Sequence, residues 1–144
     1  MKRIAIYDMD GTIVCSLHRY RTIFDNNGER IDLGYWRANE HRAMDDSLLP
    51  LAEQYKKDNA DPDCIVIIAT ARILRDADLT FISTKLGDPD HIVSRAEGDV
   101  SSGATLKVYG LKPIIEEYRD MFDIEDILFL YRRRLRSQQT RTLI

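Results

Sequence analysis

The feature that most constrains the fold is an unbroken apolar run at residues 64–69, Cys-Ile-Val-Ile-Ile-Ala. Its β-branched residues favour a strand, and the Asp61-Pro62-Asp63 segment before it is typical of a turn. The run does not alternate between apolar and polar residues, which indicates that both of its faces are buried. A strand that is covered on both faces is typical of a parallel sheet flanked by helices.

Three shorter runs predict further strands, and helical spacing of apolar residues predicts helices between them. The runs are residues 3–8, 91–94 and 127–131. The spacing predicts one helix with Ser47 as its cap. It predicts a second helix, which has its apolar face at residues 74–84 and ends at Gly87, and a third that begins near Pro113. Because strands and helices alternate along the chain, the sequence predicts an α/β fold with a Rossmann-like parallel sheet flanked by helices.

The size and composition are those of one small domain. The chain has 144 residues, of which 44% are apolar and 31% charged, so it can bury a core. It has no run of about 18 apolar residues, and acid follows the first apolar run too early for a signal peptide. Cys15 and Cys64 are too few for a disulfide framework or a zinc site. We therefore expect a cytoplasmic protein with no membrane partner and no obligate protein partner.

Two segments depart from the alternation of strands and helices. Residues 25–46 mix Tyr35 and Trp36 with many charges, and we interpret them as a small cap insertion over the end of the first strand. An ordinary surface excursion has the same pattern, and the two aromatic side chains either pack the insertion onto the domain or stack a nucleobase. Residues 132–144 contain five arginines and no acid. We predict a domain over residues 1–131 and a basic, poorly ordered tail after it.

The segment Asp8-Met9-Asp10-Gly11-Thr12 directly follows the first predicted strand. Ligands of parallel sheets bind beyond the carboxyl ends of the strands, so this loop lies where a site is expected. One of its two carboxylates can ligate Mg²⁺ and attack phosphorus, while the other moves a proton to and from the leaving oxygen. Gly11 lets the backbone approach a phosphate. A plain turn or an isolated calcium-type loop has the same spacing, but the buried strand before it favours the phosphate site.

Polar residues also follow the 64–69 run. Thr70 ends that run, and its hydroxyl can hold a phosphate oxygen, although a threonine in this position more often caps a helix. Ala71 and Arg72 come next, and Arg72 can form a bidentate phosphate contact or a surface ion pair. Arg95 is a further candidate for a phosphate contact, but a plain surface charge is the simpler interpretation.

Three features occur together in the chain: the Asp-Met-Asp-Gly-Thr segment, Thr70 after an apolar strand, and a later lysine. In this combination the chain resembles the haloacid dehalogenase superfamily of phosphohydrolases over residues 1–131. The resemblance implies that Asp8 is the nucleophile and Asp10 the general acid/base, and that both take part in binding Mg²⁺. It also implies that Thr70 and a lysine hold the phosphate. Lys107 matches the lysine better than its rival Lys112.

The resemblance extends to a narrower group, the phosphatase domain of phage polynucleotide kinase/phosphatase. The short segment between Gly11 and Ser47 and the stretch over residues 98–107 are similar in layout to that domain. This implies that the substrate is a phosphorylated small molecule such as a nucleotide, or a nucleic-acid phosphate end. The residues then expected to contact the substrate are Gly11, Thr12, Ala71 and Arg72.

The fourth element of the superfamily, an acidic pair after the strand that follows the lysine, is missing. The strand is predicted over residues 127–131, and Arg132-Arg133-Arg134 follow it. Cations do not ligate Mg²⁺ and would repel it. Asp123, Glu125 and Asp126 precede the strand, so we expect them at the opposite edge of the sheet.

Three explanations of the missing acids are open. In the first, the arginines bind phosphates in a catalytically impaired module. In the second, the site holds metal weakly through Asp8, backbone oxygen and water. In the third, a single inserted base has changed Asp-Asp codons of the form GAC-GAC-GA into CGA-CGA-CGA, which encode three arginines. We predict a Mg²⁺-dependent phosphatase that acts through an aspartyl-phosphate on nucleotide or polynucleotide phosphate ends. A phosphate-binding or nucleic-acid-binding module is the alternative.

Overall fold

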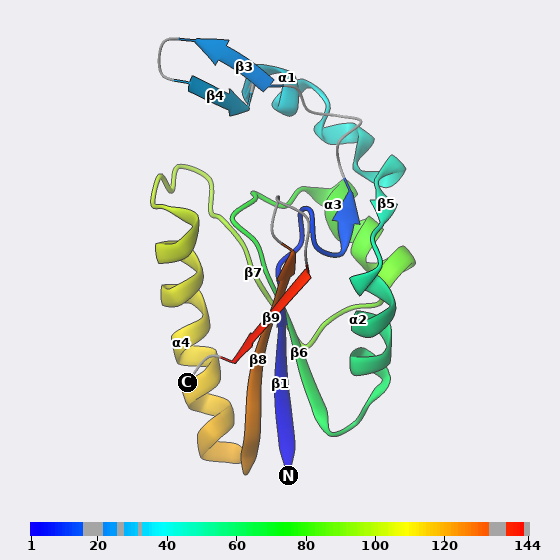
Figure 1. Cartoon of the computed structure of the whole chain (residues 1–144), viewed down its shortest axis with the longest axis vertical. Coiled ribbons are helices and arrows are strands. Elements are labelled where there is room, and N and C mark those ends of the chain that lie inside the picture. Colours follow the sequence, from blue (N-terminus) through cyan, green and yellow to red (C-terminus); the bar gives the residue numbers. More distant parts are fainter. Residues whose placement is uncertain (16–21, 26–27, 32, 133–137, 143–144) are drawn as a thin grey trace.

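A five-stranded sheet forms the centre of the computed structural model (Figure 1). The residues that the structure describes are 1–15, 22–25, 28–31, 33–132 and 138–142. In their order across the sheet, the strands are β7 (His91–Val93), β6 (Cys64–Ala69), β1 (Lys2–Tyr7), β8 (Ile124–Arg132) and β9 (Gln138–Thr142). The first four run parallel, and β9 pairs antiparallel with β8. The predicted α/β fold is confirmed, and the four predicted strands are present, with β8 beginning at Ile124 rather than at residue 127.

Helices cover both faces of the sheet, as its two-sided burial predicts (Figure 1). They are α2 (Leu51–Ala60), α3 (Asp76–Phe81) with a π-helical turn after it (Ile82–Leu86), and α4 (Gly103–Met121). Val66 and Ile68 of β6 pack in one core cluster with α2 and α3, while Ile65 and Ile67 pack in a second cluster with α4. Alternate residues of one strand therefore fill different cores, which is why the run has no polar positions. None of the helices described is long and apolar enough to cross a membrane.

The start of α4 differs from the prediction. The helix begins at Gly103, because Ser102 caps it: the Ser102 Oγ accepts a hydrogen bond from the Thr105 amide at 3.2 Å. Pro113, which we expected near the first turn, lies inside the helix. A proline there removes one backbone hydrogen bond, but Leu111 before it is buried against the sheet, and Ile114 and Ile115 after it pack on the same cluster.

The segment before α2 also differs from the prediction. Ser47, the expected cap, lies in the short strand β5 (Ser47–Leu48), and α2 begins later, at Leu51. β5 pairs antiparallel with β2 (Val14–Cys15), which follows the Asp-Met-Asp-Gly-Thr loop. This backbone pairing keeps the chain extended up to α2. The end of the second predicted helix is as expected, at Gly87, whose φ of 96° is one that glycine adopts without strain.

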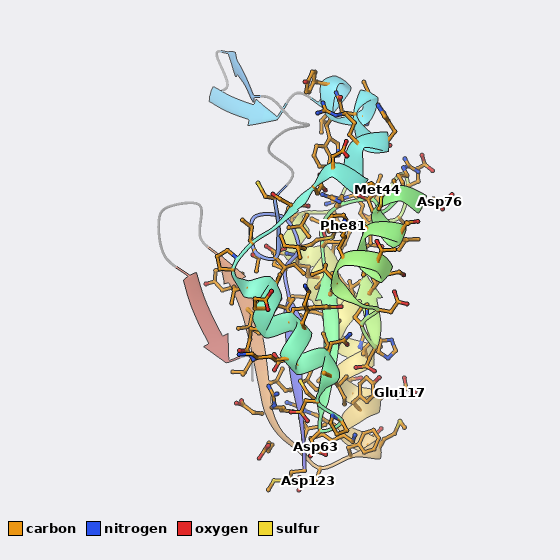
Figure 2. The ribbon with its side chains drawn as sticks, turned by 90° about the vertical axis from the view of Figure 1, so that its right-hand side faces the viewer. Met44, Asp63, Asp76, Phe81, Glu117 and Asp123 are labelled. Carbon is orange, nitrogen blue, oxygen red and sulfur yellow. The ribbon has the colours of Figure 1, made fainter. Side chains whose placement is uncertain are left out.

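An insertion lies between β2 and β5, beyond the carboxyl end of β1 (Figure 1). Its described elements are the hairpin of β3 (Thr22–Asp25) and β4 (Gly28–Ile31), the helix α1 (Leu33–Ala38) and a 3₁₀ helix (Glu40–Asp45). The 3₁₀ helix packs against α3, and Figure 2 shows its Met44 close to Phe81. The described part of the insertion begins at Thr22, before the predicted start at residue 25.

The segment predicted as a poorly ordered basic tail is in part a strand. Residues 138–142 form β9, whose register with β8 runs from Leu128 opposite Thr142 to Arg132 opposite Gln138. The prediction therefore does not hold for these residues. Arg133, Arg134 and Arg136, on which the explanations of the missing acids depend, lie outside the described residues.

A buried carboxylate ties the central strand to α2. Asp58 of α2 is almost fully buried and accepts hydrogen bonds from Tyr7 Oη at 2.5 Å, Arg3 Nη2 at 2.8 Å and Gln54 Nε2 at 3.0 Å. Burial, and then the hydrogen bond to Asp58, raise the pKa of the Tyr7 hydroxyl, so it remains a donor. Because Tyr7 immediately precedes Asp8, this network fixes the end of β1.

Asp58 provides a test of that network, with Asp61 as its matched control. Arg3 contacts both carboxylates, but the side chain of Asp61 is 37% exposed, whereas that of Asp58 is 2% exposed. We expect Asp58→Asn to lower the free energy of unfolding by about 1–3 kcal/mol, because buried donors lose a charged acceptor. Asp61→Asn should cost less than about 1 kcal/mol, as for other exposed ion pairs. Urea unfolding of both variants measures the difference, and equal losses would show that the buried network does not stabilise β1.

Gly110 tests how closely α4 packs on the sheet. A Cβ atom at this position would lie 2.4 Å from Val93 Cγ1, which is too close, so Gly110→Ala must push α4 away from β7. Overpacking costs about 1–3 kcal/mol, and the better helix propensity of alanine recovers up to about 1 kcal/mol. We expect a net loss of about 1–2 kcal/mol in urea unfolding. The exposed Val108→Ala on the same helix is the control, and a more stable Gly110→Ala variant would contradict the packing.

Candidate active site at the carboxyl edge of the sheet

The predicted site residues of β1 and β6 lie side by side at one edge of the sheet. Tyr7 is in register with Ile68 of β6 and Leu130 of β8, so Asp8 is placed between the ends of these two strands. The Asp8 amide donates to the Leu130 carbonyl at 3.1 Å, which extends the pairing by one residue. Thr70 is the first residue after β6, at the same edge of the sheet. The sheet therefore brings Asp8 and Thr70 together, as parallel pairing predicts.

Asp8 is held by two polar side chains. Lys107 Nζ lies 2.9 Å from Asp8 Oδ1, and Thr12 Oγ1 donates to Asp8 Oδ2 at 3.3 Å. Lys107 reaches Asp8 from the amino-terminal part of α4, and both side chains are partly exposed. Lys112, the rival for the phosphate lysine, is exposed farther along the same helix. Of the two lysines, the structure places Lys107 at the carboxylate.

The loop after β1 folds back on the buried Met9. The carbonyl of Met9 accepts hydrogen bonds from the amides of Thr12, Ile13 and Val14, at 3.1–3.2 Å. Gly11 has a φ of 75°, a conformation that side chains with a Cβ rarely adopt, and its amide donates to the Val14 carbonyl at 2.9 Å. This tight turn fixes the direction of the Asp10 side chain.

Asp10 is paired with a buried guanidinium. Arg72 Nη2 lies 2.5 Å from Asp10 Oδ1, and Arg72 Nε lies 3.1 Å from Asp10 Oδ2, so the contact is bidentate. On its other side, Arg72 Nη1 donates to Asp78 Oδ1 at 2.6 Å, and Asp46 Oδ2 lies 3.6 Å from Nη2. The ring of Trp36 in the insertion is 5.1 Å from the guanidinium carbon. The structure thus directs Arg72 toward carboxylates.

Sequence reasoning missed Asp46 and Asp78. Asp78 lies in the first turn of α3, where its Oδ2 accepts from the Arg75 amide at 2.9 Å, and this position is typical of a helix cap. Asp46 follows the 3₁₀ helix of the insertion. Neither is at a helical or strand spacing from Arg72, so only the tertiary fold shows that they share it.

The other predicted residues hold the loops around the site. Thr70 is buried, and its hydroxyl accepts from the Arg72 amide at 3.2 Å. Arg95 donates to the carbonyls of Ala71 at 2.7 Å, Asp99 at 2.7 Å and Ser101 at 2.8 Å. Arg95 therefore ties the loop after β6 to the loop before α4, and its guanidinium is committed to backbone oxygens.

The carboxylates can hold Mg²⁺ only in an open site. Among the residues that the structure describes, no group of three or more His, Cys, Asp or Glu side chains could hold a metal ion. Asp123 precedes β8 at the opposite end of the molecule, as expected, and Figure 2 labels it there beside Asp63. Mg²⁺ commonly uses one or two carboxylates together with water and substrate phosphate. Asp8, whose carboxylate is partly exposed, fits that mode, whereas both oxygens of Asp10 are already bound by Arg72.

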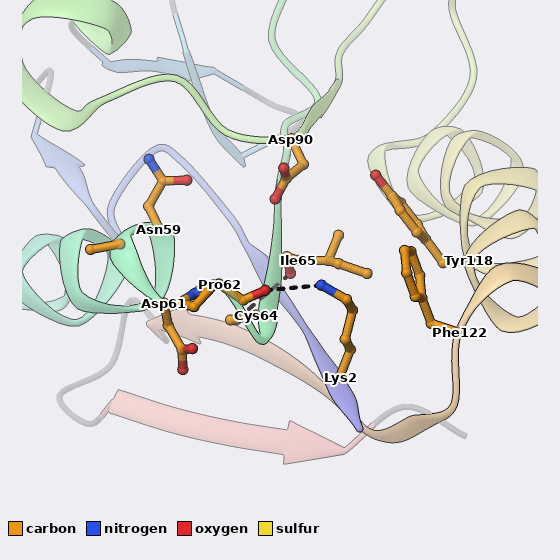
Figure 3. Close-up of a pocket in the computed structure, with 10 residues that line it drawn as sticks. Lys2, Asn59, Asp61, Pro62, Cys64, Ile65, Asp90, Tyr118 and Phe122 are labelled. Carbon is orange, nitrogen blue, oxygen red and sulfur yellow. Dashed lines mark hydrogen bonds between the residues drawn. The ribbon is translucent and has the colours of Figure 1, made fainter.

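A pocket of about 300 Å³ lies at the other, amino-terminal edge of the sheet and contains none of the predicted site residues (Figure 3). Its one lysine, Lys2, donates to the Pro62 carbonyl at 2.9 Å and lies 4.7 Å from the centre of the Phe122 ring. Burial raises the pKa of the Cys64 thiol in its wall to about 11, so this cysteine is not a nucleophile near neutral pH. The chemistry-bearing side chains are thus at the carboxyl edge.

Comparison with known proteins shows the family of the chain. A protein family described as Bacteriophage T5 5′-deoxynucleotidase matches residues 1–97, which include Asp8, Asp10 and Arg72 and end before α4. A 5′-deoxynucleotidase of Escherichia phage T5 is 35% identical over 85 residues, covering 57% of this chain and 34% of that protein. The chain thus spans about a third of the length of this curated relative. No solved structure matches. Since the family match covers more than half of the sequence, the chain belongs to the bacteriophage T5 5′-deoxynucleotidase family.

Proposed function

We propose that this chain is a 5′-deoxynucleotidase of the haloacid dehalogenase type, which removes phosphate from a deoxynucleoside 5′-monophosphate through an aspartyl-phosphate on Asp8. The observation that carries the proposal is the 2.9 Å ion pair of Asp8 with Lys107 at the carboxyl edge of the sheet, two residues from a second carboxylate. A nucleophilic carboxylate needs a cation beside it before it can approach a phosphate dianion. Family membership supports the choice of substrate.

The two aspartates divide the proposed reaction between them. An oxygen of Asp8 forms a bond to phosphorus while the bond from phosphorus to the sugar 5′ oxygen breaks, and Asp10 gives its proton to that departing oxygen. A water molecule then attacks the phosphorus. Asp10 takes a proton from this water, the bond between phosphorus and Asp8 breaks, and inorganic phosphate leaves. Both carboxyl groups are thereby restored.

Residues around Asp8 would position the phosphate. Lys107 compensates part of the negative charge that phosphate and nucleophile bring together. Thr12 orients the Asp8 carboxylate through its hydroxyl, and Thr70 and Ala71, at the adjacent strand end, are the proposed neighbours of the phosphate oxygens. Bound Mg²⁺ would be held by Asp8 and would neutralise charge on the phosphate.

Replacement of the nucleophile and of its lysine tests the proposal. We expect Asp8→Asn to abolish phosphate release from deoxythymidine 5′-monophosphate (dTMP), because an amide oxygen does not attack phosphorus. Lys107→Ala should lower kcat/KM by about 10²–10³, as for other charge-stabilising groups, and the exposed Lys112→Ala on the same helix should leave it unchanged. A colorimetric phosphate assay at several dTMP concentrations measures all three variants.

The same assay decides between substrates. Hydrolysis of a 3′-phosphorylated oligonucleotide, with none of dTMP, would contradict the 5′-deoxynucleotidase assignment and favour polynucleotide ends. Binding of dTMP by calorimetry without any Asp8-dependent release would instead indicate a phosphate-binding module. The missing acidic pair after β8 is the observation that favours this second function.

Metal removal is a separate test. We expect EDTA to abolish dTMP hydrolysis and added Mg²⁺ to restore it, because Asp8 and the phosphate are both anionic. The Mg²⁺ concentration at half-maximal activity should be in the millimolar range, since the described residues supply one partly exposed carboxylate, Asp8, rather than a cage. Full activity in EDTA would show that Lys107 alone compensates the charge.

A further inference from the structure

Arg72 is buried between two layers of carboxylates. Its side chain is 4% exposed, whereas that of Asp10 is 38% exposed and therefore open to the site. On the far side of the guanidinium, Asp78 is 2% and Asp46 1% exposed. With 4% of its side chain exposed, Arg72 offers almost no surface to a phosphate that enters from solvent.

We propose that Arg72 is a positioning residue that holds the Asp10 carboxylate in the orientation for proton transfer to the leaving oxygen, while Asp78 anchors Arg72. This inference rests on the proposed function, because Arg72 acts through Asp10. It differs from the sequence-based expectation that Arg72 contacts the substrate phosphate.

The contact between Arg72 and Asp10 is bidentate. Nε and Nη2 of Arg72 each bind one oxygen of Asp10, at 3.1 and 2.5 Å. Two parallel bonds from a planar fork fix the rotation of a carboxylate as well as its position. A lysine in the same place offers a single point charge and leaves that rotation free.

A chain of further contacts holds Arg72 itself in place. Nη1 binds Asp78 Oδ1 at 2.6 Å, and Asp78 Oδ2 accepts from the Arg75 amide at the start of α3. The Arg72 amide donates to Thr70 Oγ1, and its carbonyl accepts from the Arg95 amide at 3.0 Å. Arg72 is thus fixed at both its backbone and its side chain, which a group that orients another must be.

Three carboxylates share the positive charge of Arg72. One guanidinium faces Asp10, Asp46 and Asp78. Because its positive charge is already compensated by buried acids, it attracts an incoming phosphate dianion weakly. The same buried acids also reduce the electric field that Arg72 exerts on Asp10, while the two hydrogen bonds still orient the carboxylate.

The test compares two leaving groups. The 5′ alkoxide of dTMP needs a proton as it departs, whereas the phenolate of p-nitrophenyl phosphate leaves without one. With enzyme in excess over substrate, only the first bond cleavage is measured. We expect Arg72→Lys to slow cleavage of dTMP by about 10- to 100-fold, part of the usual effect of a general acid, and to slow cleavage of p-nitrophenyl phosphate less than about threefold.

Two further variants keep the comparison independent of folding. Asp78→Asn retains Arg72 but weakens its anchor. We expect this variant, like Arg72→Lys, to slow cleavage of dTMP more than cleavage of p-nitrophenyl phosphate. On a logarithmic scale the effect should be about a third of that of Arg72→Lys. Arg75→Lys is the matched control, because the Arg75 side chain pairs with Glu40 and Glu97 rather than with Asp10. It should leave both rates unchanged. Thermal unfolding identifies any variant that is not folded, and the comparison then uses the remaining one.

The outcomes separate the alternatives. Equal losses on both substrates, with weaker inhibition by inorganic phosphate, would show that Arg72 binds phosphate and would overturn the inference while leaving the proposed function intact. Unchanged rates in folded Arg72→Lys and Asp78→Asn would overturn it as well. A wild-type protein without Asp8-dependent cleavage of either substrate would overturn the proposed function and this inference with it.

Discussion

The position of β1 between two parallel neighbours is the constraint on which the rest of the structure depends. Ile4, Ala5, Ile6 and Tyr7 are fully buried, and each is paired with β6 on one side and β8 on the other. Burial of such side chains contributes about 1.5–3 kcal/mol for each large one, so the strand cannot slip without losing both cores. Asp8 is the first residue beyond this strand, and its place at the sheet edge follows from the register.

From that fixed point, the fold gives the two aspartates different partners. Asp8 receives an ammonium from α4, which covers one face of the sheet, and Asp10 receives a guanidinium from the loop that follows β6. Two carboxylates two residues apart would otherwise have similar surroundings. Because separate elements supply the cations, one carboxylate lies against a flexible point charge and the other against a rigid fork.

The parts of the structure that could be predicted are those set by local pattern and by the rules of parallel sheets. The run at residues 64–69 predicts β6 with its bounds, and the loop after β1 has the site carboxylates because ligands bind at strand ends. The start of α4 could not be predicted from Pro113, because a buried stripe overrides the cost of an internal proline. The partners of Arg72 could not be predicted from the sequence either, because Asp46 and Asp78 belong to different elements and come together only in the folded chain.

The charges that these contacts bring together bear on the metal. Among the described contacts, Asp8 is linked to Lys107, and Asp10, Asp46 and Asp78 are linked to Arg72. A phosphate dianion entering beside Asp8 adds negative charge next to a carboxylate. A divalent cation held by the same carboxylate and by the phosphate would offset that charge without any acid from the end of β8. We therefore expect the proposed reaction to need Mg²⁺, and we expect the missing acidic pair to weaken the binding of the ion rather than to remove the need for it.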